Sequence, residues 1–147
     1  MEQSTTTVGP GTLVRDATGG VLLADTAISA DGDTGWVQVD KPGPVVMEIK
    51  LGAIGANASF VAGGIRFEGA DTAAGANTVE YGSAPAIGPG DDNKSMYIRM
   101  DVYKQFMKAT YDITTSGSPL HSANVKLTLH EPHNRQTNVS TAAPFAE

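Results

Sequence analysis

The sequence VVMEIKL at residues 45–51 alternates between apolar and polar side chains. In an extended strand, successive side chains point to opposite faces, so the charged Glu48 and Lys50 share one face. The other face is apolar and comprises Val45, Met47, Ile49 and Leu51. Helical spacing would place these residues around the whole circumference. The stretch therefore predicts a half-buried β-strand.

The same alternation recurs at residues 107–113 and 123–130. The apolar residues of these two stretches are Met107, Ala109, Tyr111, Ile113, Val125, Leu127 and Leu129. Shorter apolar stretches bounded by turn residues predict weaker strands. These weaker strands are residues 12–15, 21–24, 36–39, 78–81 and 96–100.

Residues 59–68 change phase in the middle. The apolar positions are even-numbered up to Ala62 and odd-numbered from Ile65, with Gly63 and Gly64 between them. A glycine pair at such a slip is typical of a β-bulge or a sharp bend in a sheet. The alternative is two strands joined by a tight Gly-Gly hairpin. We favour the bulge, because each side alone is very short.

The composition is that of a β-protein. The 147 residues include 17 Gly and 8 Pro, no Cys and only 6% aromatic residues, and loops rich in Gly, Asp and Pro separate the predicted strands. Strands at this spacing predict an all-β fold, an antiparallel β-sandwich or jelly roll. We expect an N-terminal arm (1–11), one sandwich domain (12–131) and a C-terminal tail (132–147). Residues 69–93 should form a long exposed loop with one short strand.

The charge of −6 argues against a nucleic-acid partner, which would require a basic surface. Residues 1–93 carry −8 (four bases, twelve acids) and residues 94–147 carry +2 (six bases, four acids). This division is consistent with unlike faces that attract neighbouring copies or a larger partner, and equally with a solvated surface of uneven charge. The N-terminus lacks the pattern of a signal peptide and no stretch is long enough for a membrane helix, so we expect folding in a reducing cytoplasm without a membrane partner.

The motifs of common enzymes are missing. The chain has no GxSxG, no cysteine nucleophile and no phosphate-binding loop. Three histidines, His121, His130 and His133, lie near the C-terminus, but Pro132 prevents the helix on which a zinc motif would depend. We expect no catalytic residue, no metal and no cofactor.

Two other patterns suggest ligands. The sequence DGDTG at residues 31–35 begins like a calcium loop, but it lacks the closing carboxylate, so a site would need Asp91 and Asp92. An acidic turn is the simpler interpretation. Trp36 and the tyrosines Tyr81, Tyr97, Tyr103 and Tyr111 are the candidates for a carbohydrate platform, and Trp36 is either exposed or packed beneath a loop. Tyr111 is expected in the core, and so are the methionines Met96, Met100 and Met107.

Several segments together resemble the small decoration (cement) proteins of tailed-bacteriophage capsids. These segments are GDTGWVQVD (32–40), VVMEIKLGA (45–53), IRFEGADTAAGA (65–76), FMKATYDITTSG (106–117) and ANVKLTL (123–129). The resemblance covers roughly residues 12–131 and rests on turn pattern and strand order. It implies a non-enzymatic homo-oligomer, a dimer or trimer, on the outer capsid surface of the virion. Such a protein binds between major capsid protein subunits and stabilises the shell.

The predicted arms suit that role. Polar terminal segments are poor at folding alone and can become ordered on a partner. The Thr-rich start could add a strand to the sheet edge of a neighbour, and a Pro-Phe pair could anchor the tail in a pocket. The candidate capsid or inter-subunit contacts are Thr5, Thr6, Thr7, Pro144 and Phe145.

Two other functions remain open from the sequence. The first is a carbohydrate-binding β-sandwich module on a virion surface, which would use Trp36 and nearby loops. The second is a metal-dependent β-barrel enzyme, which would use His121, His130 and His133.

Overall fold

The computed structural model describes residues 20–39 and 42–131. Within them the chain forms β-strands and a single turn of 3-10 helix, η1 (Pro89–Asp91). The strands are β2 (Val21–Ile28), β3 (Gly32–Asp33), β4 (Val37–Gln38), β5 (Gly43–Ile54), β6 (Ser59–Ala70), β7 (Val79–Ser83), β8 (Ser95–Val102), β9 (Phe106–Thr114) and β10 (Ala123–His130). The predicted arms, the predicted strand 12–15 and the five candidate contact residues lie outside the described residues.

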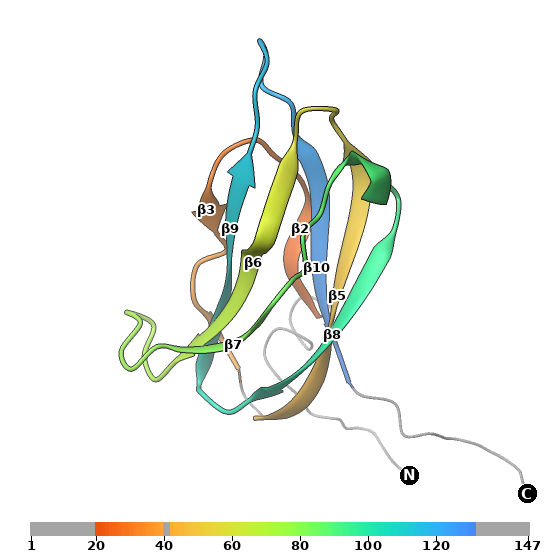
Figure 1. Ribbon diagram of the computed structural model, residues 1–147. Helices are drawn as coiled ribbons and strands as arrows, with labels where there is room; N and C mark the ends of the chain where they lie inside the picture. The colour runs from red at the N-terminus through yellow and green to blue at the C-terminus, as the bar shows by residue number, and fades with distance from the viewer. Residues whose placement is uncertain (1–19, 40–41, 132–147) are drawn as a thin grey trace, which may run out of the picture.

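The strands form two antiparallel sheets that pack face to face (Figure 1). One sheet has the order β2-β10-β5-β8. The other has the order β3-β9-β6-β7, and β4 also pairs with β9. This arrangement confirms the predicted all-β sandwich.

The pairing follows a nested pattern along the chain. If β3 and β4 are counted as one interrupted edge strand, the first of eight strands pairs with the last (β2 with β10) and the second with the seventh. The third pairs with the sixth (β5 with β8) and the fourth with the fifth (β6 with β7). Nested antiparallel pairs of this kind make up the two Greek keys of a jelly roll.

The core lies between the sheets and contains the predicted alternating residues. Met47 and Ile49 of β5 are fully buried, and so are Phe67 of β6 and Met107 of β9. Met100 is buried as expected, whereas Met96 and Tyr111 are partly buried at the edge of the core. Burial of one face of each sheet is the main source of stability for such a fold.

The phase slip in β6 is a bulge, as predicted. Phe60 pairs with Ile113, but the next pair is Ile65 with Tyr111, so β6 contains extra residues relative to β9. Gly63 adopts a left-handed φ of 79° within this bulge. The strand continues through it, so the alternative of two strands joined by a hairpin is wrong.

The predicted strand boundaries were less accurate than the core. The expected strand at 36–39 is only the two residues of β4, and the predicted turn at 31–35 contains β3, which pairs with β9. Residues 69–93 contain the one short strand expected there, β7, and in addition the end of β6 and the 3-10 turn η1. In the part of the chain that the structure describes, no helix has the length and apolarity to cross a membrane.

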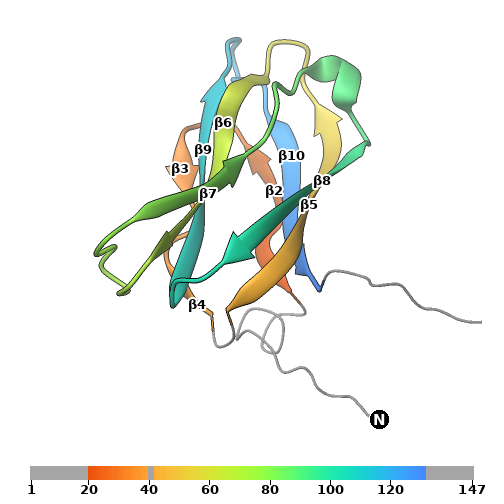
Figure 2. The ribbon, with the colours of Figure 1, turned by 60° about the horizontal axis from the view of Figure 1, so that its bottom comes forward.

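Both ends of the described body leave the sandwich at the same end. The N–H of Leu129 donates to the carbonyl of Gly20 at 2.6 Å, so the start of β2 lies beside the end of β10. The β6–β7 loop (residues 71–78) and the β8–β9 turn (residues 103–105) lie at this end as well (Figures 1 and 2). We call these two segments, with Gly20 and Glu131, the lower end.

Candidate functional site

The β6–β7 loop projects beyond the sheets at the lower end (Figures 1 and 2). Its sequence, DTAAGANT at residues 71–78, consists of small side chains, most of them exposed. A projecting segment of this kind can reach a partner that the flat faces of the sheets cannot. It is the candidate docking element of the described body.

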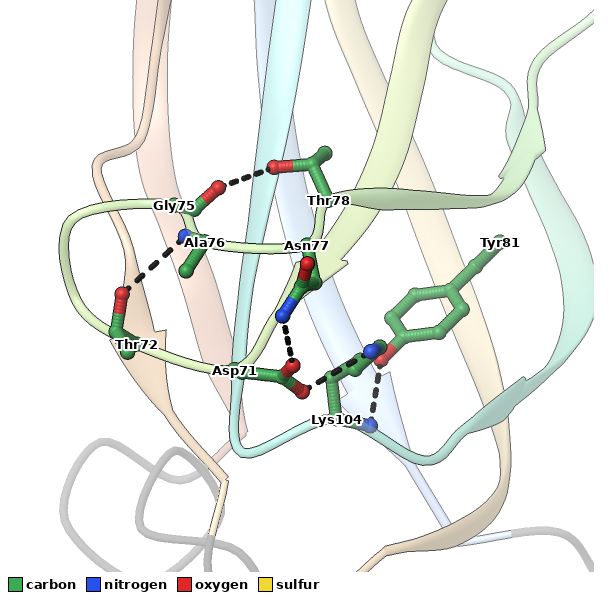
Figure 3. Close-up of polar contacts among 8 residues, drawn as sticks. All are labelled: Asp71, Thr72, Gly75, Ala76, Asn77, Thr78, Tyr81 and Lys104. Carbon is green, nitrogen blue, oxygen red and sulfur yellow. Dashed lines mark hydrogen bonds and ion pairs between the residues drawn. The ribbon is translucent and has the colours of Figure 1, made fainter.

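Hydrogen bonds within the loop hold its shape. The hydroxyl of Thr72 accepts from the N–H groups of Ala74 and Ala76 at 3.3 and 3.2 Å. The N–H of Asp71 donates to the carbonyl of Ala76 at 2.8 Å. The hydroxyl of Thr78 donates to the carbonyl of Gly75 at 2.7 Å (Figure 3). Thr and Asp side chains often satisfy the loop backbone in this way.

Four residues, Asp71, Asn77, Tyr81 and Lys104, join the loop to the β8–β9 turn, and we call them the clasp. The Asp71 carboxylate forms an ion pair with the Lys104 ammonium at 3.0 Å and accepts from the Asn77 amide at 2.8 Å (Figure 3). The hydrogen bond from Asn77, followed by that from Lys104, lowers the pKa of the Asp71 carboxyl from its ordinary 3.8. The carboxylate therefore stays charged at any pH near neutrality.

Tyr81 completes the clasp from β7. Its hydroxyl accepts from the backbone N–H of Lys104 at 3.0 Å, and its ring meets that of Tyr103 edge to face, with centroids 5.6 Å apart. Burial raises the pKa of the Tyr81 phenol above its ordinary 10.0. The tyrosine is thus a neutral structural contact and not a titrating group near neutral pH.

Trp36 packs against the loop. The Lys108 ammonium lies 4.7 Å from the centroid of the indole ring, in a cation–π arrangement. A Cβ added at Gly75 would come within 3.1 Å of the indole nitrogen, so the loop backbone passes close to the ring. Of the two placements considered for Trp36, the structure shows packing against a loop. This packing leaves less of the indole ring available for stacking on a sugar.

The aspartates of the calcium-like sequence have structural partners. Asp31 accepts from the N–H of Ile113 at 2.8 Å, and Asp33 accepts from that of Gly35 at 2.7 Å. Asp91 accepts from the N–H of Gly88 at 2.9 Å within the turn around η1. Each of these three carboxylates thus holds its own turn or strand edge. Within residues 20–39 and 42–131, no group of three or more His, Cys, Asp or Glu side chains is gathered to hold a metal ion.

The histidines lie at opposite ends of β10. His121 Nδ1 accepts from the N–H of Asn57 at 3.0 Å, whereas His130 Nε2 lies 2.8 Å from the carboxylate of Glu48. Nine residues of extended chain span about 30 Å, so these two imidazoles do not share a metal ion. His133 lies outside the described residues.

The charge division along the chain does not produce two separate faces. β9 and β10 insert between strands from the first part of the chain, so that late bases lie beside early acids. Lys104 pairs with Asp71, and Lys108 lies opposite Glu68 in the β6–β9 register. In the described body the acids of the first part of the chain and the bases of the second part are therefore interleaved, contrary to the unlike faces suggested by the sequence.

The clasp was missed in the sequence. Asp71 and Lys104 are far apart in the chain, and neither stands in a recognisable motif. The only signal was the run of Asp, Thr and Asn around Gly75, which is typical of a loop with internal hydrogen bonds. Neither a comparison with models of protein families nor a search of curated proteins finds a match to this chain.

Proposed function

We propose that this protein decorates a bacteriophage capsid and cements it by binding between major capsid protein subunits on the outer surface. In this role it is a non-enzymatic structural protein that acts as a homo-oligomer. The proposal rests on the resemblance noted in the sequence and on one structural observation. The β6–β7 loop lies at the lower end, together with Gly20 and Glu131, the two ends of the described chain (Figure 1).

That observation supports the proposal for a geometric reason. A cementing protein must contact several subunits at once, and multivalent attachment is strongest when the contacting segments share one side of a rigid body. The loop is already held in shape by the Asp71–Lys104 pair, so little conformational entropy is lost when it docks. The described chain begins at Gly20 and ends at Glu131 on this same side.

The sandwich itself supplies the rigid body. Side chains of β5 and β10 pack against those of β6 and β9 to form one continuous core. A close-packed core resists deformation and transmits load between the points of attachment. In the proposed role, this stiffness is what opposes movement of neighbouring capsid subunits.

The first test removes the protein from particles of the phage that encodes it. Particles without the protein should be less resistant to heat and to salt than complete particles, as measured by loss of infectivity. Added protein should restore that resistance. Deletion of residues 1–9 or 137–147 should weaken attachment and leave the circular dichroism spectrum of the body unchanged. Undiminished heat resistance without the protein would contradict the proposal.

The second test addresses the loop with a matched pair of variants. Ala74→Arg places a long charged side chain on the exposed loop, whereas Ala56→Arg makes the same change at an exposed turn between β5 and β6 at the opposite end. Sedimentation with shells of the major capsid protein should show at least tenfold weaker binding for Ala74→Arg and unchanged binding for Ala56→Arg. Equal binding by both variants would remove the loop from the contact.

A further inference from the structure

A second surface feature lies on the outer face of the four-stranded sheet. A hollow of about 350 Å³ is lined by side chains from three adjacent strands and the residue after β10. The lining residues are Val46, Glu48, Tyr97, His130 and Glu131. In the strand register Tyr97 lies directly opposite Glu48, and His130 lies directly opposite Val46. The hollow is therefore built on a rigid sheet and not on loops.

Tyr97 provides an exposed aromatic surface in the hollow. Its side chain is 64% exposed, although its neighbours in β8, Met96 and Ile98, pack against the core. A tyrosine on a strand has few rotatable bonds, so it offers a large amphipathic contact at low entropic cost. Such a ring can stack against the C–H face of a pyranose.

Glu48 and His130 provide a fixed polar pair beside that ring. Their side chains are 2.8 Å apart, and they are 20% and 45% exposed. A carboxylate has about four acceptor sites, of which the imidazole occupies one, so Glu48 retains acceptors for hydroxyl groups. Hydrogen bonds to a charged oxygen are among the stronger ones.

An aromatic face beside a polar edge matches the two-sided chemistry of a sugar. We propose that this hollow binds a gluco-configured saccharide, with a pyranose ring on Tyr97 and its hydroxyl groups on Glu48 and His130. The volume lies near the lower limit of about 300–1,000 Å³ for small-ligand sites, which suits one or two sugar rings. The site uses Tyr97, one of the tyrosines considered in the sequence, and not Trp36.

The saccharide site does not depend on the proposed capsid role. The clasped loop belongs to the five-stranded sheet, and the hollow belongs to the four-stranded sheet. Isolated protein suffices to test the hollow, whereas the decoration proposal is tested on particles. Either proposal can thus fail alone.

The test is an NMR titration of the ¹⁵N-labelled full chain with cellohexaose, chitohexaose and maltohexaose. At least one of these should shift the amide resonances of residues 46–48 and 96–98. Tyr97→Ala and Glu48→Gln should each weaken that binding at least tenfold. Tyr103→Ala is the matched control, because Tyr103 is similarly exposed, at 58%, and lies outside the hollow.

Each outcome of the titration has one meaning. Selective loss of binding with Tyr97→Ala and Glu48→Gln supports the site. Absence of shifts with all three hexasaccharides overturns it, and so does equal loss of binding with Tyr103→Ala. If Tyr97→Ala alters the fold by circular dichroism, Tyr97→Leu replaces it, since leucine keeps bulk on the strand and removes the ring.

Discussion

The Lys104 ammonium lies 3.0 Å from the Asp71 carboxylate and joins the β8–β9 turn to the β6–β7 loop. The lysine side chain is only 17% exposed, whereas the aspartate is 44% exposed. Lys104 is therefore held mainly by the body, and Asp71 brings the loop to it. The arrangement explains how a loop of small residues keeps a defined position without an apolar anchor of its own.

Acid should release this loop. Since the folded-state pKa of Asp71 is lowered from 3.8, its stabilising contribution is fully present above that value and is lost as the pH falls through the lower folded-state value. In ¹⁵N relaxation experiments, order parameters for residues 72–78 should be about 0.85 near neutral pH and below about 0.6 once Asp71 is protonated.

Asp71→Asn isolates the cause of that transition. The amide cannot pair with Lys104 as an ion, so the loop of this variant should be loose at neutral pH and should show little further change in acid. Asp112→Asn, which alters an exposed carboxylate on β9, should behave as the wild type. A rigid loop in Asp71→Asn at neutral pH would contradict the role of the ion pair.

Gly69 should not tolerate a side chain. A Cβ at this position would overlap the ring of Tyr81, which the bond from the Lys104 N–H holds in place. Gly69→Ala should destabilise the fold by about 1–3 kcal/mol, the usual cost of overpacking. Urea unfolding measures the effect, with Gly88→Ala as the control, because a Cβ at Gly88 has no atom within 4 Å. Equal stability of the two variants would refute the contact.

The core could be predicted well from the sequence, because a strand with one buried face has an apolar residue at every second position. Met47 and Ile49 could be assigned to the core from the alternation alone, since every other arrangement placed Glu48 or Lys50 inside. The bulge was also predictable, because only inserted residues let Phe60 and Ile65 both reach the core. These are local patterns, and the sandwich enforces them along its length.

The candidate sites could not be predicted in the same way. The contacts Asp71–Lys104 and Glu48–His130 join residues that lie far apart in the chain, and their distance depends on register and topology. β3 and β4 are two-residue strands that exist only because β9 offers them partners. No periodicity extends over two residues, so tertiary pairing alone determines such elements.

Substitution of Gly63 in the β6 bulge should be costly because of its backbone conformation. Gly63 has φ of 79°, and the nearest atom to an added Cβ is 4.0 Å away, so a substitution there meets strain and not a clash. Gly63→Ala should cost about 1–2 kcal/mol, the penalty for a left-handed residue with a side chain. Gly63→Asn should cost less, because asparagine tolerates this region. If urea unfolding shows the same loss of unfolding free energy for both variants, the left-handed φ is not the cause of the cost.

Trp36 is the only tryptophan of the chain, so its fluorescence reports on the loop that packs against it. Thr72→Ala removes the hydroxyl that accepts the N–H groups of Ala74 and Ala76. Each lost hydrogen bond is worth about 1 kcal/mol, so the loop should open more often and expose the indole. Acrylamide should then quench the emission of Thr72→Ala more efficiently than that of the wild type.

Thr72→Ser is the matched control for that experiment, because serine keeps the hydroxyl and loses only a methyl group. Its quenching should equal that of the wild type. Opening of the loop also exposes the indole to water, so the emission maximum of Thr72→Ala should move to longer wavelength as quenching rises. If Thr72→Ala and Thr72→Ser are quenched alike, the hydroxyl does not hold the loop, and the clasp at Asp71 carries that role alone.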